Sequence, residues 1–506
     1  MIKKISDFEK MSRKFNKFYI NVFSVFCVQI LIKIVGMIYN LYLTNNEVYS
    51  DSGNGIFMSA HQIYILFLTI SIVGIPTSIS KLISSRSRNN EDVRKIVNIS
   101  LMIWGFIGVL ESILLIKFSD FISNKILGNI HAKDVLKILA IGIAFVNFNA
   151  VFRGALNGIE KTSEGVIIQF VEQLIKVLFT MIGICWLAYN KLETQTNMLY
   201  IVSYGVTISV IITFFIYVYK WEKYKNNIIE DSNIRYIEII KNVFLLSIPI
   251  TIIGMFGSIN KNIDSISLRL LLKDIFDINK INEMYGIIIS KVDILINLPI
   301  GLNSSLTITL LPKLSRLYSE RKFDEMKSVM CSSINISMCL AIPIMIGYIF
   351  FSKEIFNLLY PNANSGAELL KLSSILIILN IILQILMVYF NSIGNTNIII
   401  KTFIIGAISK LVMNIVLIQI PFIYEKGIII SSIFSDLFII YLLVKGKEFK
   451  IIDFKFRDLK INEIIFDTFF MIFIMLFVNN IGGFFCVNNK ILFIISLRNR
   501  GIFIFL

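Results

Sequence analysis

The chain has 506 residues, of which 56% are hydrophobic and only 16% charged, and its formal net charge is +15. In a soluble protein about a quarter of the residues are charged, so the composition excludes an ordinary soluble domain and favours a membrane protein. The positive balance needs no nucleic-acid partner, because basic loops that face anionic membrane lipids explain it.

Uncharged apolar runs recur along the whole chain. Each is close to the length of about 20 residues that an α-helix needs to cross the hydrocarbon of a bilayer. One such run could be a buried core helix, but the repeated pattern predicts an all-α polytopic membrane protein with about fourteen transmembrane helices. In chain order, the predicted spans are 18–43, 57–80, 96–116, 133–156, 165–189, 197–219, 242–268, 285–310, 328–350, 370–390, 398–420, 428–444, 462–479 and 483–497.

Lysine and arginine gather in alternate connections between these spans. Residues 1–17 hold six of them, whereas residues 44–56 hold none. Further basic connections lie at 81–95, 220–241, 313–327 and 445–460. Because moving these residues across the membrane is disfavoured, we predict a multi-pass protein of the cell membrane with both termini and the basic connections in the cytoplasm.

Cysteine and histidine give no sign of a metal or redox site. The five cysteines form no C-x-x-C pair, and the chain has only two histidines. We therefore expect cysteines that serve as packing residues, no metal and no cofactor. The connections between spans are too short for a soluble catalytic domain, so we do not expect an enzyme.

Two parts of the chain repeat at nearly equal offsets. The run "SKLISSRSRNNEDVRKIVNIS" at 80–100 shares seven identities with "PKLSRLYSERKFDEMKSVMCS" at 312–332 under a shift of 232 positions. A shift of 234 positions places Lys176 on Lys410. Each match is weak by itself, but the agreement of the two offsets indicates an internal duplication.

The duplication predicts two six-helix lobes, at 1–222 and 235–445, followed by a helix pair at 461–506. Six is an even number, so both lobes enter the membrane in the same sense. This is the parallel-repeat arrangement of many transporters, in which the substrate site lies between the halves.

Ionisable residues inside the spans are the sharpest functional signal, because a charge in lipid is costly. Glu172 and Lys176 are spaced to pair on one helix face. Gln169 and Gln173 extend this face into a polar stripe, which fits either structural pairing or a cavity wall. Lys176 and its repeat mate Lys410 each lie about 18 Å into their spans, so both should face the protein interior.

A second group of polar residues lies in predicted spans one, seven and eight. It consists of Lys33, Asn40, Lys261, Asp264, Arg269, Lys291 and Asp293. A water-filled cavity lined by this group, which is more basic than acidic, would attract phosphate or carboxylate. The alternative is that each lysine neutralises an aspartate and holds the helices together.

Four motifs resemble a known transporter family: "VGIPTSISKL", "FRGALNGIEKT", "PITIIGMFGSINKNIDS" and "YGIIISKVDILINLPIGLNSSLTITLLPKLSRLYSE". They are similar to the multidrug/oligosaccharidyl-lipid/polysaccharide (MOP) exporter superfamily, above all to its stage V sporulation protein B and lipid II flippase-like branch. The resemblance implies two six-helix lobes with two further C-terminal helices. It also implies transport of a polyprenyl-diphosphate-linked saccharide across the cytoplasmic membrane by alternating access.

The resemblance also assigns roles to individual residues. Its candidate diphosphate contacts are Lys33, Lys261, Arg269 and Lys291. Asn40 departs from the family pattern, because "GMIYN" stands where G-x-I-Y-R is usual. Coupling to a cation cannot be read from the sequence: Glu172, Asp264 or Asp293 are candidates to bind H⁺ or Na⁺, and it stays open that none of them does.

The expected function is transport of a lipid II-like peptidoglycan precursor for spore cortex synthesis. A general cell-wall or capsule precursor flippase of the same fold is an alternative that the residues leave open. A cation-coupled multidrug exporter would favour an acidic cavity, and the excess of lysine argues against it. Short outer connections disfavour a membrane-embedded sugar-transfer enzyme, and the sequence does not indicate an oligomeric state.

Overall fold

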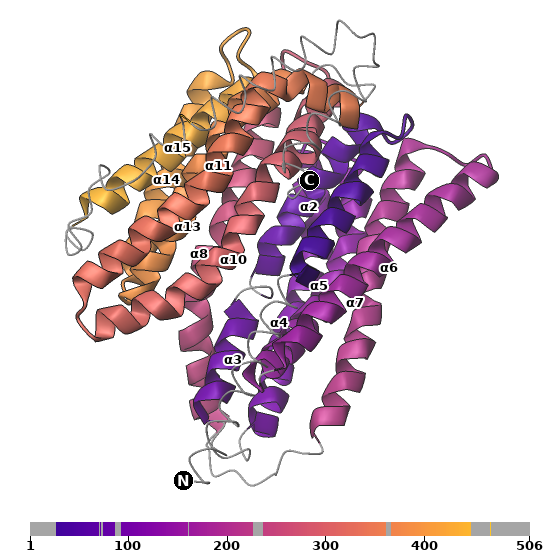
Figure 1. Ribbon diagram of the computed structural model, residues 1–506. Helices are drawn as coiled ribbons and strands as arrows, with labels where there is room; N and C mark the ends of the chain where they lie inside the picture. Colours follow the sequence, from indigo (N-terminus) through magenta and orange to yellow (C-terminus); the bar gives the residue numbers. More distant parts are fainter. Residues whose placement is uncertain are drawn as a thin grey trace, which may run out of the picture. The chain divides into compact units, whose positions relative to one another are not determined.

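The computed structural model describes residues 27–69, 71, 74–86, 93–159, 161–225, 236–360, 366–446 and 466. Every regular element in these ranges is helical, including two π-helical segments (Figure 1). Ten of the described helices are long and apolar enough to cross a membrane, and a bent helix pair would add an eleventh. The prediction of an all-α polytopic membrane protein is confirmed.

Contacts divide the chain into two compact units. Unit 1 comprises residues 1–291 and 407–428, and unit 2 comprises residues 292–406 and 429–506. The repeat predicts other bounds for its two lobes, so the duplication stays a prediction.

The helices of unit 1 follow one another along the chain. They are Cys27–Thr44, α2 (Ser50–Thr69), α3 (Ile75–Arg86), α4 (Val93–Phe121), η3 (Ile122–Ile126), α5 (Ala132–Gly158), α6 (Thr162–Tyr189), α7 (Gln195–Lys225), α8 (Tyr236–Leu272), α9 (Ile278–Gly286) and η4 (Ile287–Val292), whose last residue belongs to unit 2.

The start of α2 differs from the sequence prediction. The side chain of Asn46 accepts hydrogen bonds from the backbone N–H groups of Val48 and Tyr49, which turns the chain into the helix. Asp51 lies in the first turn, where a negative charge favours a helix. The connection predicted at 44–56 is therefore mostly helical.

The second predicted span, 57–80, covers parts of two described helices, α2 and α3. Helix α2 ends at Thr69 and α3 begins at Ile75. The described residues between them, Ser71 and Gly74, are π-helical, so the described part of the chain does not show an interruption of this span.

Helix α5 is central to unit 1 and packs against α2, α3, α4 and α7. Small residues in the C-terminal part of α5 let α3 approach that helix closely. A Cβ atom on Gly154 would lie 2.9 Å from Pro76, and one on Gly158 would lie 2.7 Å from Ile83. Close approach over small residues is a common way for membrane helices to pack.

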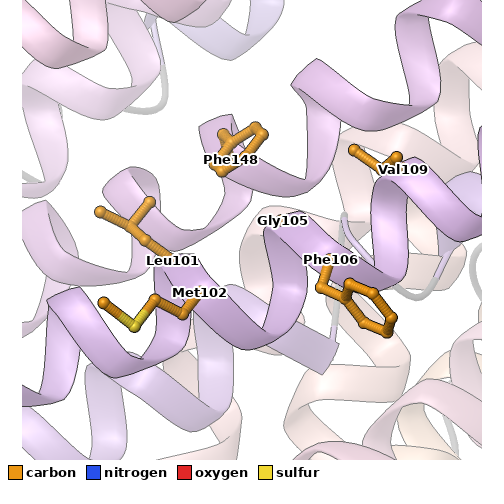
Figure 2. A pocket seen from close by; sticks show the side chains of 6 residues that line it. All are labelled: Leu101, Met102, Gly105, Phe106, Val109 and Phe148. Atoms are coloured by element: carbon orange, nitrogen blue, oxygen red, sulfur yellow. The ribbon is translucent and has the colours of Figure 1, made fainter.

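The outer face of α4 is apolar, as expected for side chains that meet lipid. It carries a shallow groove of about 440 Å³. The groove is lined by Leu101, Met102, Gly105, Phe106, Val109 and Phe148 (Figure 2). Met102 and Phe106 are 76% and 71% exposed, and the lining contains no charged side chain, so this surface suits lipid chains.

Unit 2 contains the remaining helices, with part of α14 and the start of α15 assigned to unit 1. They are α10 (Asp293–Ser319), α11 (Phe323–Leu359), α12 (Ala367–Ser373), α13 (Ile375–Ser392), α14 (Thr396–Leu417) and α15 (Glu425–Lys445). Asn303 of α10 donates a hydrogen bond to Gln384 of α13 at 2.8 Å and accepts one from Ser337 of α11 at 2.6 Å. Polar contacts of this kind hold membrane helices together.

The last two predicted spans, 462–479 and 483–497, lie outside the described residues, apart from Phe466. The same holds for residues 1–26 and for nearly all of the predicted C-terminal helix pair, 461–506. The total of fourteen spans therefore stays a prediction.

Candidate functional site

Most of the predicted site residues fall into three polar clusters of unit 1. We call them the α6 cluster (Tyr39, Glu172, Lys176, Thr180 and Thr213), the α8–α14 cluster (Asp264, Lys410 and Asn414) and the α2–α9 cluster (Asp51, Arg269, Asn282 and Lys291). Lys33, Asn40 and Lys261 lie in unit 1 outside these clusters, and Asp293 belongs to unit 2.

The α6 cluster joins α6 to the first helix and to α7. The Nζ atom of Lys176 lies 5.3 Å from the centroid of the Tyr39 ring, within the range of a cation–π interaction. The Tyr39 hydroxyl donates a hydrogen bond to Thr180 at 3.3 Å. The Thr213 hydroxyl donates one to Glu172 at 3.4 Å.

Glu172 and Lys176 are both described and half-exposed, and the ion pair that their spacing allows is not formed between them. They still lie within electrostatic range of each other, and Arg153 of α5 is a second cation in range of Glu172. Arg153 also donates a hydrogen bond to the carbonyl of Ser71 at 3.4 Å. Glu172 therefore has two cations in electrostatic range, Lys176 and Arg153.

Asp264 is the centre of the α8–α14 cluster. Its Oδ2 lies 2.7 Å from the Nζ of Lys410, and its Oδ1 accepts a hydrogen bond from Asn414 at 3.1 Å. Lys410 and Asn414 are one turn apart on α14, so both reach the same carboxylate. All three residues are buried. Lysines of spans one, seven and eight were the predicted partners of the aspartates, and the structure pairs Asp264 with a lysine of α14 instead.

The α2–α9 cluster contains a second buried ion pair. The Nζ of Lys291 lies 2.8 Å from Oδ2 of Asp51, and the Lys291 side chain is only 2% exposed. Lys291 lies in the π-helical segment η4, and such segments are frequent at functional sites. Asp51 precedes the second predicted span. Burial raises the pKa of its carboxyl group, and the hydrogen bond and charge of Lys291 act in the opposite direction.

Arg269 of α8 donates hydrogen bonds within the same cluster. Its guanidinium donates hydrogen bonds to the Asn282 side chain and to the Leu127 carbonyl, both at 2.8 Å. A longer contact, 3.4 Å, reaches the carbonyl of Gly55 on α2. Arg269 is buried, so in this structure neither Arg269 nor Lys291 is open to a ligand.

The remaining predicted residues have different surroundings. Lys33 and Lys261 are half-exposed on the first helix and on α8. Asn40 is buried, and its side-chain oxygen has no hydrogen-bond partner among the described residues. Asp293 is half-buried in the first turn of α10, and its backbone carbonyl accepts a hydrogen bond from Asn297 at 2.7 Å.

Two members of the α2–α9 cluster, Asp51 and Asn282, were not predicted from the sequence. Asp51 stands in the polar run "SDSGNG", which was assigned to an outer connection. Its partner Lys291 is 240 positions away, and no spacing pattern in one sequence links residues at that separation.

The sequence matches the family described as polysaccharide biosynthesis protein over residues 18–318, which is more than half of the chain. The chain belongs to this family. Residues 284–416 also match the MatE family. The expected membership in the MOP exporter superfamily, in a branch with flippase-like members, is confirmed.

Two known proteins that are similar to this chain are lipid II flippases. The lipid II flippase MurJ of Bacillus subtilis (strain 168) is 20% identical over 413 residues, which cover 76% of this chain and 75% of that protein. A solved structure of lipid II flippase MurJ in an inward closed conformation has a TM-score of 0.69 at 16% identity, covering 93% of this chain and 95% of that one.

A multidrug resistance MATE family transporter of the MOP superfamily, in an inward-facing conformation, has a TM-score of 0.67 at 14% identity. That match covers 85% of this chain and 98% of the other. At these identities the structural likeness shows the fold alone. This polysaccharide biosynthesis family protein therefore has the fold of MOP transporters.

Proposed function

We propose that the protein is a lipid-linked saccharide transporter. It flips a polyprenyl-diphosphate peptidoglycan precursor of the lipid II type across the cytoplasmic membrane by alternating access. The observation that carries this proposal is the similarity to the Bacillus subtilis lipid II flippase MurJ over about three quarters of both chains. Membership in the polysaccharide biosynthesis family supports it.

The residues that would bind the diphosphate are the half-exposed lysines of the membrane helices. Lys33 on the first helix and Lys261 on α8 are the leading candidates, because Lys291 and Lys410 are buried in ion pairs in this structure. Lysine ammonium groups are common partners of phosphate oxygens. Lys176 of the α6 cluster is a further half-exposed cation.

The alternation of basic connections supports an orientation with both termini in the cytoplasm. In this orientation the precursor is taken up at the cytoplasmic face, and its polyprenyl tail stays in lipid. Glu172 and Asp293 are the half-buried carboxylates that H⁺ or Na⁺ would use if transport is coupled to a cation.

The physiological role in this proposal is spore cortex synthesis. A strain without the gene should grow normally but form spores that lack cortex and heat resistance. Heat-resistant spores together with a vegetative wall or capsule defect would overturn the sporulation role and favour a general precursor flippase.

A second candidate is a cation-coupled multidrug exporter, which the MatE match over residues 284–416 favours. The same strain separates the two functions. Hypersensitivity to organic cations, with normal spores and a normal cell wall, would support the exporter and contradict the flippase.

A further inference from the structure

Helices α2 and α9 cross with their backbones in contact. A Cβ atom on Gly55 of α2 would lie 1.8 Å from the carbonyl oxygen of Asn282 on α9, and one on Gly286 would lie 2.0 Å from the carbonyl oxygen of Asp51. No larger residue fits at either position while the helices are so placed. The two glycines therefore permit one specific close crossing of these helices.

A buried ion pair joins the two sides of this crossing. Asp51 on α2 and Lys291 on η4 are 2.8 Å apart, and the Lys291 side chain is almost fully buried. A buried charge that loses its partner is strongly unfavourable, because neither water nor another charge replaces it. Arg269 adds hydrogen bonds from α8 to Asn282 and Gly55. These contacts favour the closed crossing.

Other features of the crossing oppose it. Buried polar atoms without a hydrogen-bond partner among the described residues include Ser52 Oγ, Asn54 Oδ1, Asn282 Nδ2 and Ser290 Oγ. Polar groups of this kind cost free energy while they are buried, and they gain hydrogen bonds when water enters. The crossing thus combines a strong local attachment with groups that favour opening, as expected for a contact that forms and breaks.

We propose that the Asp51–Lys291 pair is a releasable latch that holds α2 and η4 together in one conformation of the transport cycle and separates in another. Asp51 lies just before the second predicted span and Lys291 lies in the eighth, so the latch links the two halves of the predicted duplication. The inference rests on the proposed function, because alternating access requires contacts between the halves to open.

The test measures access to a buried cysteine placed next to Lys291 in the chain. Ser290 is fully buried beside Lys291, and Ser290→Cys is a small change. In purified protein from which the native cysteines have been removed, N-ethylmaleimide should label this cysteine slowly. Asp51→Asn should raise the labelling rate by about tenfold or more, since loss of one partner of a buried ion pair shifts an equilibrium at least that far.

Exchanging the two charges distinguishes an effect of the ion pair itself from a general intolerance of the site to substitution. Asp51→Lys combined with Lys291→Asp should restore slow labelling. The control is Asp120→Asn, which breaks an exposed 2.6 Å pair with Lys133 and should leave the rate unchanged. If a folded Asp51→Asn variant labels at the parental rate, the latch is overturned. If Asp51→Asn does not fold, the reversed pair decides, and its failure to fold or to label slowly also overturns the latch.

Labelling does not depend on a substrate, so the latch and the proposed function fail separately. If Asp51→Asn raises the labelling rate but the protein moves no polyprenyl-linked saccharide, the latch is supported and the flippase function is contradicted. If the protein flips its substrate but Asp51→Asn leaves the labelling rate unchanged, the flippase function is supported and the latch is contradicted.

Discussion

Two side chains of α14 stabilise the buried negative charge of Asp264. Lys410 and Asn414 occupy both carboxylate oxygens, and the three residues are almost inaccessible to solvent. Lys176, which the repeat pairs with Lys410, has no such bond. It is half-exposed and lies over the ring of Tyr39. Two lysines at positions that the predicted repeat makes equivalent thus have different physical roles.

This difference gives a prediction for stability. Lys410→Gln should lower the free energy of unfolding by about 3–5 kcal/mol, because it leaves Asp264 charged and buried without its cation. Lys176→Gln is the matched control and should cost about 1 kcal/mol or less, the scale of a cation–π contact. Denaturant unfolding in detergent measures both values.

A double change should recover the loss. Lys410→Met with Asp264→Leu replaces the buried pair with apolar side chains, which proteins often tolerate without loss of stability. If Lys410→Gln is as stable as Lys176→Gln, the structural role given to the Asp264–Lys410 pair is wrong.

The sequence could predict that Lys410 faces the protein interior, because its depth in a span makes a lipid-facing charge costly. It could not predict the partner. Asp264 and Lys410 are separated by 146 positions, whereas spacing arguments act over one or two helical turns. For the same reason, the sequence could not predict Asp51 as the partner of Lys291.

At the scale of elements, the predicted spans agree with the described helices better than the predicted connections do. Hydropathy detects apolar runs, but it does not detect helix that continues beyond the membrane. Helix α2 begins at Ser50, and α10 continues to Ser319, with α11 starting at Phe323.

These helix bounds determine how the topology should be tested. Asn54 stands in the predicted outer connection but is fully buried in α2, so a cysteine there would not report sidedness. Glu47 is exposed in the short connection before α2, and Ser319 is exposed at the end of α10. In intact cells that lack the native cysteines, Glu47→Cys should react with an impermeant thiol reagent and Ser319→Cys should not.

Permeabilised cells provide the control, since both cysteines should react there. Reaction of Ser319→Cys in intact cells, with Glu47→Cys protected, would reverse the orientation that the alternation of lysine and arginine predicts.

At the scale of the whole molecule, composition and hydropathy were enough to predict an all-α polytopic membrane protein, and the quoted motifs indicated its superfamily. The predicted lobes, 1–222 and 235–445, follow an alignment of the sequence with itself. The compact units have other bounds because residues up to Lys291 and residues 407–428 pack with the first part of the chain. Packing depends on contacts that no local pattern encodes.

The central claim is that half-exposed lysines of the membrane helices bind a polyprenyl diphosphate during transport. Lys33 and Lys261 are the residues to test, and Lys137 is a matched control because it is a partly exposed lysine that pairs with Asp134 on its own helix. Each is changed to glutamine. Unfolding temperatures of the purified variants show whether any change acts through stability.

The most direct measurement is the rate at which purified protein in liposomes moves a fluorescent lipid II-like precursor from one leaflet to the other. The parent protein and Lys137→Gln should move it at equal rates. Lys33→Gln and Lys261→Gln should each be slower by about tenfold, the loss of one hydrogen bond to a charged group, with unchanged unfolding temperatures. A folded parent protein that moves no polyprenyl-diphosphate saccharide, or that moves it equally fast without these lysines, would contradict the account.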